Sequence, residues 1–162
     1  MSDISIRLAT KDDAEAIVTM LTQLANDIGS ADHFFSTREA IAEYGFGTRP
    51  MFECFVAERQ KTNLGLVLFF PIFSTNRAKP GVYVQDLWIS GDTRGQGLGR
   101  RLLAEVVNYS ARNWDASYLS LMVYADNIKA REFYKKLGFD KCENDVSKAL
   151  DGDAFAQLKS AL

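Results

Sequence analysis

Apolar residues along this chain follow two different periods, which divide it into strands and helices. Residues 4–8 alternate apolar and polar side chains, and this period of two predicts a strand. From Lys11 onward the apolar residues recur at the spacing of one helix face, so we expect a helix up to Gly29, with Thr10 as its N-cap. A shorter helix is predicted over Thr37–Tyr44, closed by the glycines that follow.

The middle and end of the chain alternate strands with helices. Three strands are predicted at 52–57, 65–73 and 82–89, and the second is almost wholly apolar, as expected for a strand covered on both faces. The later elements are a helix over 98–114, a strand over 118–124, a helix over 128–137, one or two strands from Phe139 onward and a short final helix after 151–153. This order predicts an α/β fold with a mixed, twisted sheet flanked by helices.

Composition narrows the class of protein. The chain has 162 residues, of which 47% are hydrophobic and 25% charged, so we expect a single domain over 1–162 rather than a disordered or fibrous chain. It contains no apolar stretch of about 18 residues and no signal-like start, which predicts a cytoplasmic protein without a membrane segment.

Two cysteines and one histidine limit the metal chemistry. A structural zinc site needs four ligands, which Cys54, Cys142 and His33 cannot complete, so we expect no metal and assign both cysteines to the core as reduced thiols.

Charge is unevenly distributed. The sequence pI of about 5.4 argues against a nucleic-acid partner. Residues 1–58 contain 4 Lys and Arg against 10 Asp and Glu, whereas the remainder contains 15 against 11. A protein that joins a cationic substrate to an anionic cofactor would need such a division, although an uneven solvated surface explains it equally well.

The sharpest chemical signal is the glycine-rich segment Arg94–Gly99, between a predicted strand and the long helix. Glycines at a helix start let a phosphate approach the backbone N–H groups, and the helix dipole adds positive charge. The segment therefore predicts a diphosphate site, with Arg100 and Arg101 as further charges. It is not a P-loop, because Arg100 stands where that motif has lysine.

Three motifs in order resemble the GNAT acyl-CoA N-acyltransferases. The loop R-G-Q-G-L-G fits (Q/R)xxGx(G/A), Asp86–Ile89 looks like the D-L-x-V strand before it, and Asn127–Phe139 is similar to the N-xx-A-xx-FY-xx-LGF segment. The stretch Gly45–Glu58 and the chain end are similar to the polyamine and thialysine N-acetyltransferases. The resemblance covers nearly the whole chain and implies the GNAT fold, acetyl-CoA as acetyl donor and a homodimer.

The resemblance also implies roles for individual residues. Tyr134 matches the family tyrosine that protonates the leaving thiolate, and its alternative is a packed helix aromatic. Asn127 matches a residue near the pantetheine arm and would also suit a helix N-cap. The residues expected to contact acetyl-CoA are Leu87, Trp88, Ile89, Arg94, Gly95, Gln96, Gly97, Leu98, Gly99, Arg100, Asn127 and Tyr134.

The acceptor side departs from the relatives. They have Glu-Asp on the strand before the loop, where this chain has Gln85-Asp86. Gln85 cannot accept a proton, so Asp86 is the candidate catalytic base, with a hydrogen-bonded structural acid as the alternative. Asp27-Ile28-Gly29 replaces the Tyr-Glu-Tyr that lines the polyamine site. We expect Asp27, Gln85 and Asp86 at the acceptor site.

These observations predict an enzyme that transfers acetyl from acetyl-CoA to a primary amine of a small cationic acceptor. The acceptor would be a diamine, a polyamine or an amino-acid-like amine, and it would attack the thioester directly. Two alternatives remain open: an acetyltransferase acting on protein N-termini or lysines, and a catalytically idle acyl-CoA-binding module.

Overall fold

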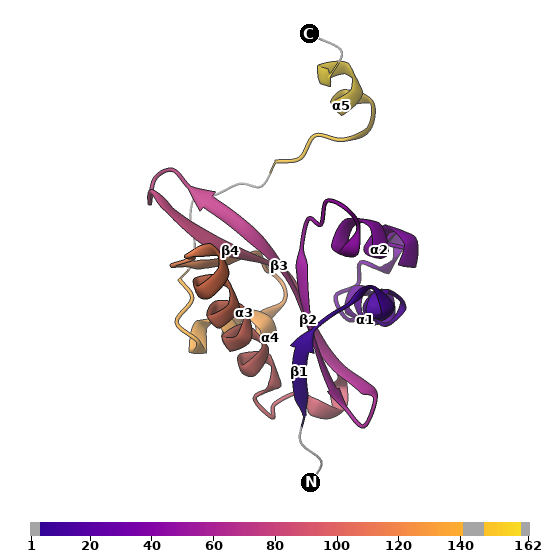
Figure 1. Cartoon of the computed structure of the whole chain (residues 1–162), viewed down its shortest axis with the longest axis vertical. Helices are drawn as coiled ribbons and strands as arrows, with labels where there is room; N and C mark the ends of the chain where they lie inside the picture. The colour runs from indigo at the N-terminus through magenta and orange to yellow at the C-terminus, as the bar shows by residue number, and fades with distance from the viewer. Residues whose placement is uncertain (1–3, 141–147, 160–162) are drawn as a thin grey trace. The chain divides into compact units, whose positions relative to one another are not determined.

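A computed structural model describes residues 4–140 and 148–159 of the chain. Contacts between residues divide the chain into two compact units, 1–128 and 129–162. The first unit is built around a sheet with helices on both faces (Figure 1). Cys142 and most of the strand predicted after Phe139 lie outside the described residues, and residues 139–140 and 148–150 have no regular structure.

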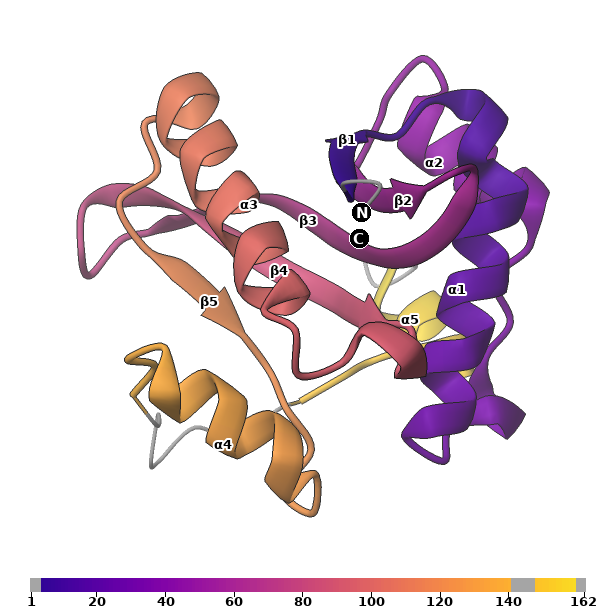
Figure 2. The same cartoon turned by 90° about the horizontal axis from the view of Figure 1, so that it is seen from below.

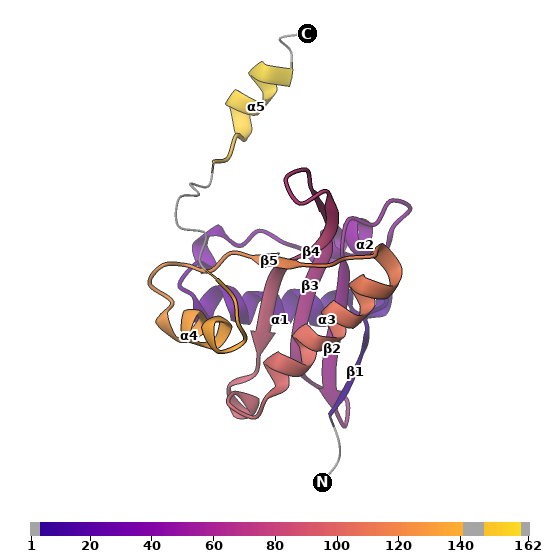
Figure 3. The same ribbon diagram turned by 90° about the vertical axis from the view of Figure 1, so that its left-hand side faces the viewer.

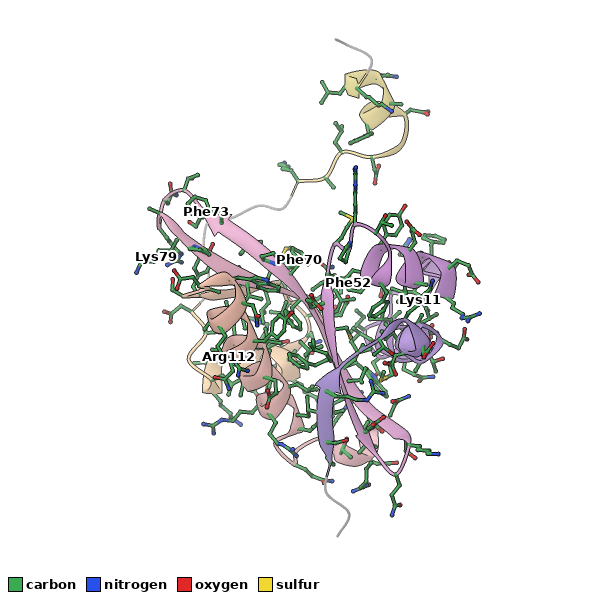
Figure 4. The ribbon with its side chains drawn as sticks, in the orientation of Figure 1. Lys11, Phe52, Phe70, Phe73, Lys79 and Arg112 are labelled. Atoms are coloured by element: carbon green, nitrogen blue, oxygen red, sulfur yellow. The ribbon has the colours of Figure 1, made fainter. Side chains whose placement is uncertain are left out.

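The sheet has five strands whose order follows the sequence. Neighbouring strands are antiparallel, except that β4 and β5 are parallel, which confirms the predicted mixed sheet. β3 and β4 continue beyond the end of β2 as a two-stranded hairpin, on which Phe73 and Lys79 are labelled in Figure 4. The strands are β1 (Ser5–Leu8), β2 (Glu53–Arg59), β3 (Thr62–Ser74), β4 (Lys79–Ile89) and β5 (Leu119–Leu121).

Helices cover both faces of this sheet. α1 (Ala14–Asp27) and α2 (Arg38–Phe46) lie on one face, and α3 (Leu98–Trp114) lies on the opposite one (Figures 2 and 3). Short 3-10 turns at Lys11–Asp13, Ala31–His33 and Gly91–Thr93 connect these elements. The second unit contains most of α4 (Ile128–Lys136) and all of α5 (Gly152–Lys159).

Two apolar layers hold the first unit together. On the α1 side, helix residues such as Ile17 and Met20 pack against Val56, Leu66 and Leu68 of the sheet. On the α3 side, aromatic rings form a cluster in which every neighbouring pair of centroids is 5.4–5.8 Å apart; its members are Phe55, Phe69, Tyr109 and Trp114. Cys54 is a buried free thiol of the first layer, as predicted, and burial raises its pKa.

The end of α2, near Gly45, differs from the predicted end. The sequence predicts that the second helix ends at Tyr44, whereas α2 continues through Gly45 to Phe46. A Cβ atom on Gly45 would lie 2.6 Å from the ring of Phe52, so this glycine permits close packing rather than ending the helix. The strand predicted over 118–124 is also shorter than expected, because only Leu119–Leu121 pairs with β4.

Arg7 ties the start of α1 to the edge of the sheet. Its guanidinium donates two hydrogen bonds of 2.8 Å to the carboxylate of Asp13 and a third, of 3.2 Å, from Nε to Glu58 on β2. The hydrogen bonds from Arg7 lower the pKa of Asp13 from 3.8 to about 2. Asp13 also accepts from the backbone N–H of Thr10 at 2.7 Å. Thr10 is the N-cap of the 3-10 turn, and α1 itself begins three residues later than predicted, with Asp13 as its N-cap.

We expect Asp13→Asn to lower the free energy of unfolding by about 1 kcal/mol near pH 7, a modest figure because Arg7 is partly exposed. Since the folded pKa is depressed, the contribution of Asp13 is present above pH 4 and is lost as pH falls through about 2. Urea unfolding of both proteins at pH 7 and at pH 2.5 measures it. A gap that stays constant between the two pH values would contradict the ion pair.

Candidate functional site

A β-bulge in β4 determines which face of the sheet carries Asp86. Phe69 of β3 pairs with Val84, and the next β3 residue, Leu68, pairs with Asp86, so Gln85 is an extra residue without a cross-strand partner. Directly paired residues point to the same face, and Leu68 belongs to the α1 layer whereas Phe69 belongs to the α3 cluster. The bulge therefore moves Asp86 to the α1 face, where strict alternation would have placed it with Val84 on the other.

Asp86 is a half-buried carboxylate without a charged partner. Desolvation by burial raises its pKa from 3.8 to about 6. No hydrogen bond or ion pair of this carboxylate is found within residues 4–140 and 148–159, and no fully buried polar side-chain atom there lacks a partner. Neither oxygen of Asp86 is therefore completely shielded from solvent. No hydrogen bond within the described residues thus holds Asp86 as a structural acid, and a raised pKa is common among proton acceptors.

Two aromatic rings lie beside Asp86 on the same face. Phe70 of β3 pairs with Tyr83 of β4, and their rings are stacked with centroids 5.2 Å apart. Burial, with the nearby charge of Asp86, raises the pKa of Tyr83. Phe70 is labelled on the sheet in Figure 4. An apolar surface thus adjoins the carboxylate.

The far end of β4 has an open edge. β5 pairs with Val82, Tyr83 and Val84 only, so the backbone from Gln85 to Ile89 has β3 on one side and no described strand on the other. Leu87, Trp88 and Ile89, which the sequence assigns to the cofactor, belong to this edge. Unpaired N–H and C=O groups along such an edge can bind an extended ligand that carries amide groups.

The glycine-rich loop has the conformation that anion binding requires. Gly95 and Gly97 adopt positive φ angles of 78° and 81°, and no other atom lies within 4 Å of where their Cβ atoms would be. The backbone N–H groups of Gly95, Gly97, Leu98 and Gly99 donate to nothing in the described parts of the chain. They lie at the start of α3, a helix of 17 residues, whose dipole favours an anion there. These residues fit a diphosphate.

Buried and charged side chains fix this loop from both ends. Thr93 is 1% exposed, and its backbone and side chain both donate to the Ser90 carbonyl. The side chain of Gln96, expected at the cofactor, donates to the Asp92 carbonyl at 2.8 Å. Arg101 donates to the carbonyl of Ile4 at 2.9 Å, whereas Arg100 is exposed and has no hydrogen bond or ion pair with any described residue. Arg100 is thus the arginine available to an anion.

The carboxylate of Asp27 contacts one residue of β4 and one of the glycine-rich segment. The indole Nε1 of Trp88 donates to Asp27 Oδ2 at 3.0 Å, and Arg94 forms an ion pair with the same oxygen. The structure therefore brings together a residue expected at the acceptor and two expected at acetyl-CoA. Nothing in the sequence indicates this contact, because Asp27 lies 61 residues from Trp88 and 67 from Arg94.

Tyr134 belongs to the second unit, whereas Asp86 and the loop belong to the first. Its ring contacts those of Phe133 and Phe139, with centroids 5.1 and 5.3 Å away. Burial raises the pKa of Tyr134 to about 12, so its hydroxyl stays protonated throughout the neutral range. Asn127 is half-buried and lies directly before α4, at the position where a cap is expected.

The described residues include neither a membrane-spanning helix nor a cluster of metal ligands. Within 4–140 and 148–159, no helix combines the length and the apolar character needed to cross a bilayer. The same residues contain no cluster of three His, Cys, Asp or Glu side chains able to hold a metal ion.

Known proteins resemble this chain in sequence and in fold. The thialysine N-epsilon-acetyltransferases of Sus scrofa and Mus musculus are each 30% identical to it over 98% of both chains. Among solved structures, an integron cassette protein from the mobile metagenome of V. cholerae has a TM-score of 0.80 at 19% identity and covers 99% of each chain. An aminoglycoside acetyltransferase from an uncultured soil metagenomic sample has a TM-score of 0.75 at 15% identity, over 91% of this chain and 95% of its own.

The sequence pattern of the acetyltransferase (GNAT) family matches residues 18–139, a range that includes Asp27, Asp86, the glycine-rich loop and Tyr134. The solved structures confirm the predicted GNAT fold, in which an open mixed sheet carries helices on both faces. This chain belongs to the acetyltransferase (GNAT) family and is an N-acetyltransferase.

Proposed function

We propose that this enzyme transfers an acetyl group from acetyl-CoA to the primary amine of a small cationic acceptor. The observation that carries the proposal is Asp86, a solvent-accessible carboxylate with a raised pKa on the strand that leads into the glycine-rich loop. A proton acceptor on the strand that precedes an anion-binding loop suits acetyl transfer from a diphosphate-bearing donor. The similarity to thialysine N-epsilon-acetyltransferases supports an amine as acceptor.

Acetyl-CoA is the donor that the family generally uses, and it supplies an activated acetyl group as a thioester. The free N–H groups of Gly95, Gly97, Leu98 and Gly99 would hold its diphosphate, with Arg100 adding a full positive charge. The open edge of β4 at residues 87–89 would hold its amide-containing arm. The resemblance supports Asn127 and Tyr134 as further contacts of acetyl-CoA, and we propose a single transferase domain over 1–162.

Proton transfer is assigned to Asp86 and Tyr134. An amine must lose its ammonium proton before its nitrogen attacks the thioester carbonyl, and Asp86 accepts that proton directly or through water. Its pKa of about 6 leaves it mostly ionised at pH 7, yet more basic than an ordinary aspartate. The protonated hydroxyl of Tyr134 donates to the sulfur as the C–S bond breaks, and the second proton lost by the attacking nitrogen restores this hydroxyl through solvent. No covalent bond to the enzyme is needed, so positioning and charge stabilisation provide the catalysis.

The acceptor is proposed to be small and cationic. The acidic excess of residues 1–58 attracts a cation, and the stacked rings of Phe70 and Tyr83 give its carbon chain an apolar surface beside Asp86. Gln85, the exposed residue of the bulge, offers hydrogen bonds but no charge for a second ammonium group. An amino-acid-like amine or a diamine therefore suits this site better than a long polyamine. We further propose that the enzyme is a homodimer, which the resemblance implies, and that it is cytoplasmic.

A screen of acceptors tests this function. We expect acetyl-CoA-dependent release of free thiol with thialysine, lysine or putrescine, weaker activity with spermidine, and little with a neutral amine, because the acidic half of the chain favours cations. The measurement is kcat/KM for each amine. No turnover with any amine, or activity confined to peptides, would contradict the proposal; spermidine preferred by orders of magnitude would contradict the role given to Gln85.

Asp86→Asn separates catalysis from stability. In the native enzyme, kcat/KM should rise with pH through about 6, because the base must be ionised, and this limb should disappear in the variant together with most of the activity. The variant should also unfold at a higher temperature at pH 7. A pKa raised from 3.8 to about 6 means that ionised Asp86 costs the folded state roughly 3 kcal/mol above pH 6.

The stability difference should shrink as pH falls from 6 to 4, where Asp86 is protonated in the folded state. Thermal unfolding across this pH range measures the stability difference. The control is Asp92→Asn, which changes an exposed aspartate in the turn before the glycine-rich segment. A variant that keeps the native pH profile would rule out Asp86 as the base.

Tyr134→Phe removes one hydroxyl and keeps the ring. If that hydroxyl protonates the leaving sulfur, kcat should fall by roughly 10²–10⁴-fold while acetyl-CoA binding is retained. Steady-state rates and calorimetric binding give the two quantities. Tyr124→Phe makes the same change at a tyrosine that is 58% exposed, and it should leave both unchanged. Native turnover in the Tyr134→Phe variant would show that Tyr134 serves packing alone.

A further inference from the structure

Three elements of the first unit meet at a single oxygen atom. Asp27 is the last residue of α1, Trp88 lies near the end of β4, and Arg94 opens the glycine-rich segment of the loop. Asp27 Oδ2 accepts from the Trp88 indole at 3.0 Å and forms the ion pair with Arg94. The carboxylate thus connects the α1 layer to the proposed acetyl-CoA site.

Arg94 is held at both ends of its guanidinium. Its Nε donates to the carbonyl of Ile89 at 2.9 Å, while its Nη2 forms the ion pair with Asp27. The side chain therefore turns back across the start of the loop, from the end of β4 to the end of α1. This arrangement restrains the backbone immediately before Gly95 and Gly97, the two glycines of this loop that adopt positive φ and have little conformational restraint of their own.

We infer that Asp27 is a positioning residue for the acetyl-CoA loop, acting through Arg94 and Trp88, and not a contact for the acceptor amine. The inference rests on the proposed function in taking acetyl-CoA as the ligand of this loop. Asp27 keeps Arg94 folded back, so that the free N–H groups of Gly95 and of residues 97–99 stay arranged for a diphosphate. Arg94 thereby contributes geometry, and Arg100 contributes the charge.

The charges at Asp27 support this division of roles. A carboxylate paired with a guanidinium has little net charge left to attract a cationic amine. The pair is also partly exposed, with 38% of the Asp27 side chain and 52% of the Arg94 side chain accessible, so it contributes little to folding stability. Its loss should therefore appear in ligand affinity and not in the unfolding temperature.

The test compares ligand binding with acceptor kinetics. Asp27→Ala should weaken acetyl-CoA binding in calorimetry by roughly tenfold, the effect of losing one charged hydrogen-bonded contact. The KM for the acceptor at saturating acetyl-CoA should not change. Asp27→Asn keeps an oxygen that accepts from Trp88, so its affinity should fall between those of Asp27→Ala and the native enzyme. Asp32→Ala removes an exposed carboxylate of equal charge and should change neither quantity.

Two further variants test the route through Arg94. Arg94→Ala should weaken binding as Asp27→Ala does, and the double variant should bind no more weakly than Arg94→Ala alone, because both changes break one contact. Gly97→Val, which puts a β-branched side chain at a positive φ within the loop, serves as the reference for lost acetyl-CoA binding. Fully additive losses would overturn the inference.

Hydrogen exchange tests the positioning without any ligand. Amides of residues 90–99 should exchange faster in Asp27→Ala than in the native protein or in Asp32→Ala, and unchanged exchange would overturn the inference. A raised acceptor KM with native acetyl-CoA affinity would return Asp27 to the acceptor site, also against the inference. If the native protein binds no acetyl-CoA, the proposed function fails, and the exchange result alone decides whether Asp27 orders the loop.

Discussion

The arrangement of the proposed active site depends on the β-bulge at Gln85, where β4 has one residue more than the facing stretch of β3. Successive side chains of a strand alternate between faces, so Val84 and Asp86 would share the apolar α3 face in an unbroken ladder. Gln85 interrupts the alternation and moves Asp86 to the α1 face, next to the stacked rings of Phe70 and Tyr83. The bulge thus joins an apolar surface to a proton acceptor.

β4 also connects the proposed base to the open edge and the anion-binding loop proposed to bind acetyl-CoA. Just before the bulge, residues 82–84 of β4 are paired on both sides; beyond the bulge, β5 does not continue and one edge of β4 is open. The chain then passes through buried Thr93 into the glycine-rich start of α3. Proposed base, open edge and anion-binding loop therefore follow one another within about 15 residues, and a rigid sheet sets their spacing.

Electrostatics distinguishes the two acidic residues that the sequence assigns to the acceptor. Asp86 has no hydrogen bond or ion pair with any described residue and burial raises its pKa, which is why we propose it as the base, at a cost in stability. Asp27 is neutralised by Arg94 and bound by Trp88, so it acts on the structure of the loop. Residues of the same type thus have different roles because of the groups that surround them.

The sequence by itself determined the elements and the chemistry of local segments. The helical period of residues 14–24, the apolar run of β3 and the glycines of Arg94–Gly99 each depend on neighbours within a few positions, and the predicted α/β fold followed from them. Gly45 was misread as a helix end because its packing partner, Phe52, comes from the next element. The face carrying Asp86 and the contacts of Asp27 were decided only by the tertiary structure. Register across a sheet and ion pairs between residues more than 60 positions apart depend on how separate elements pack, and no local pattern encodes that.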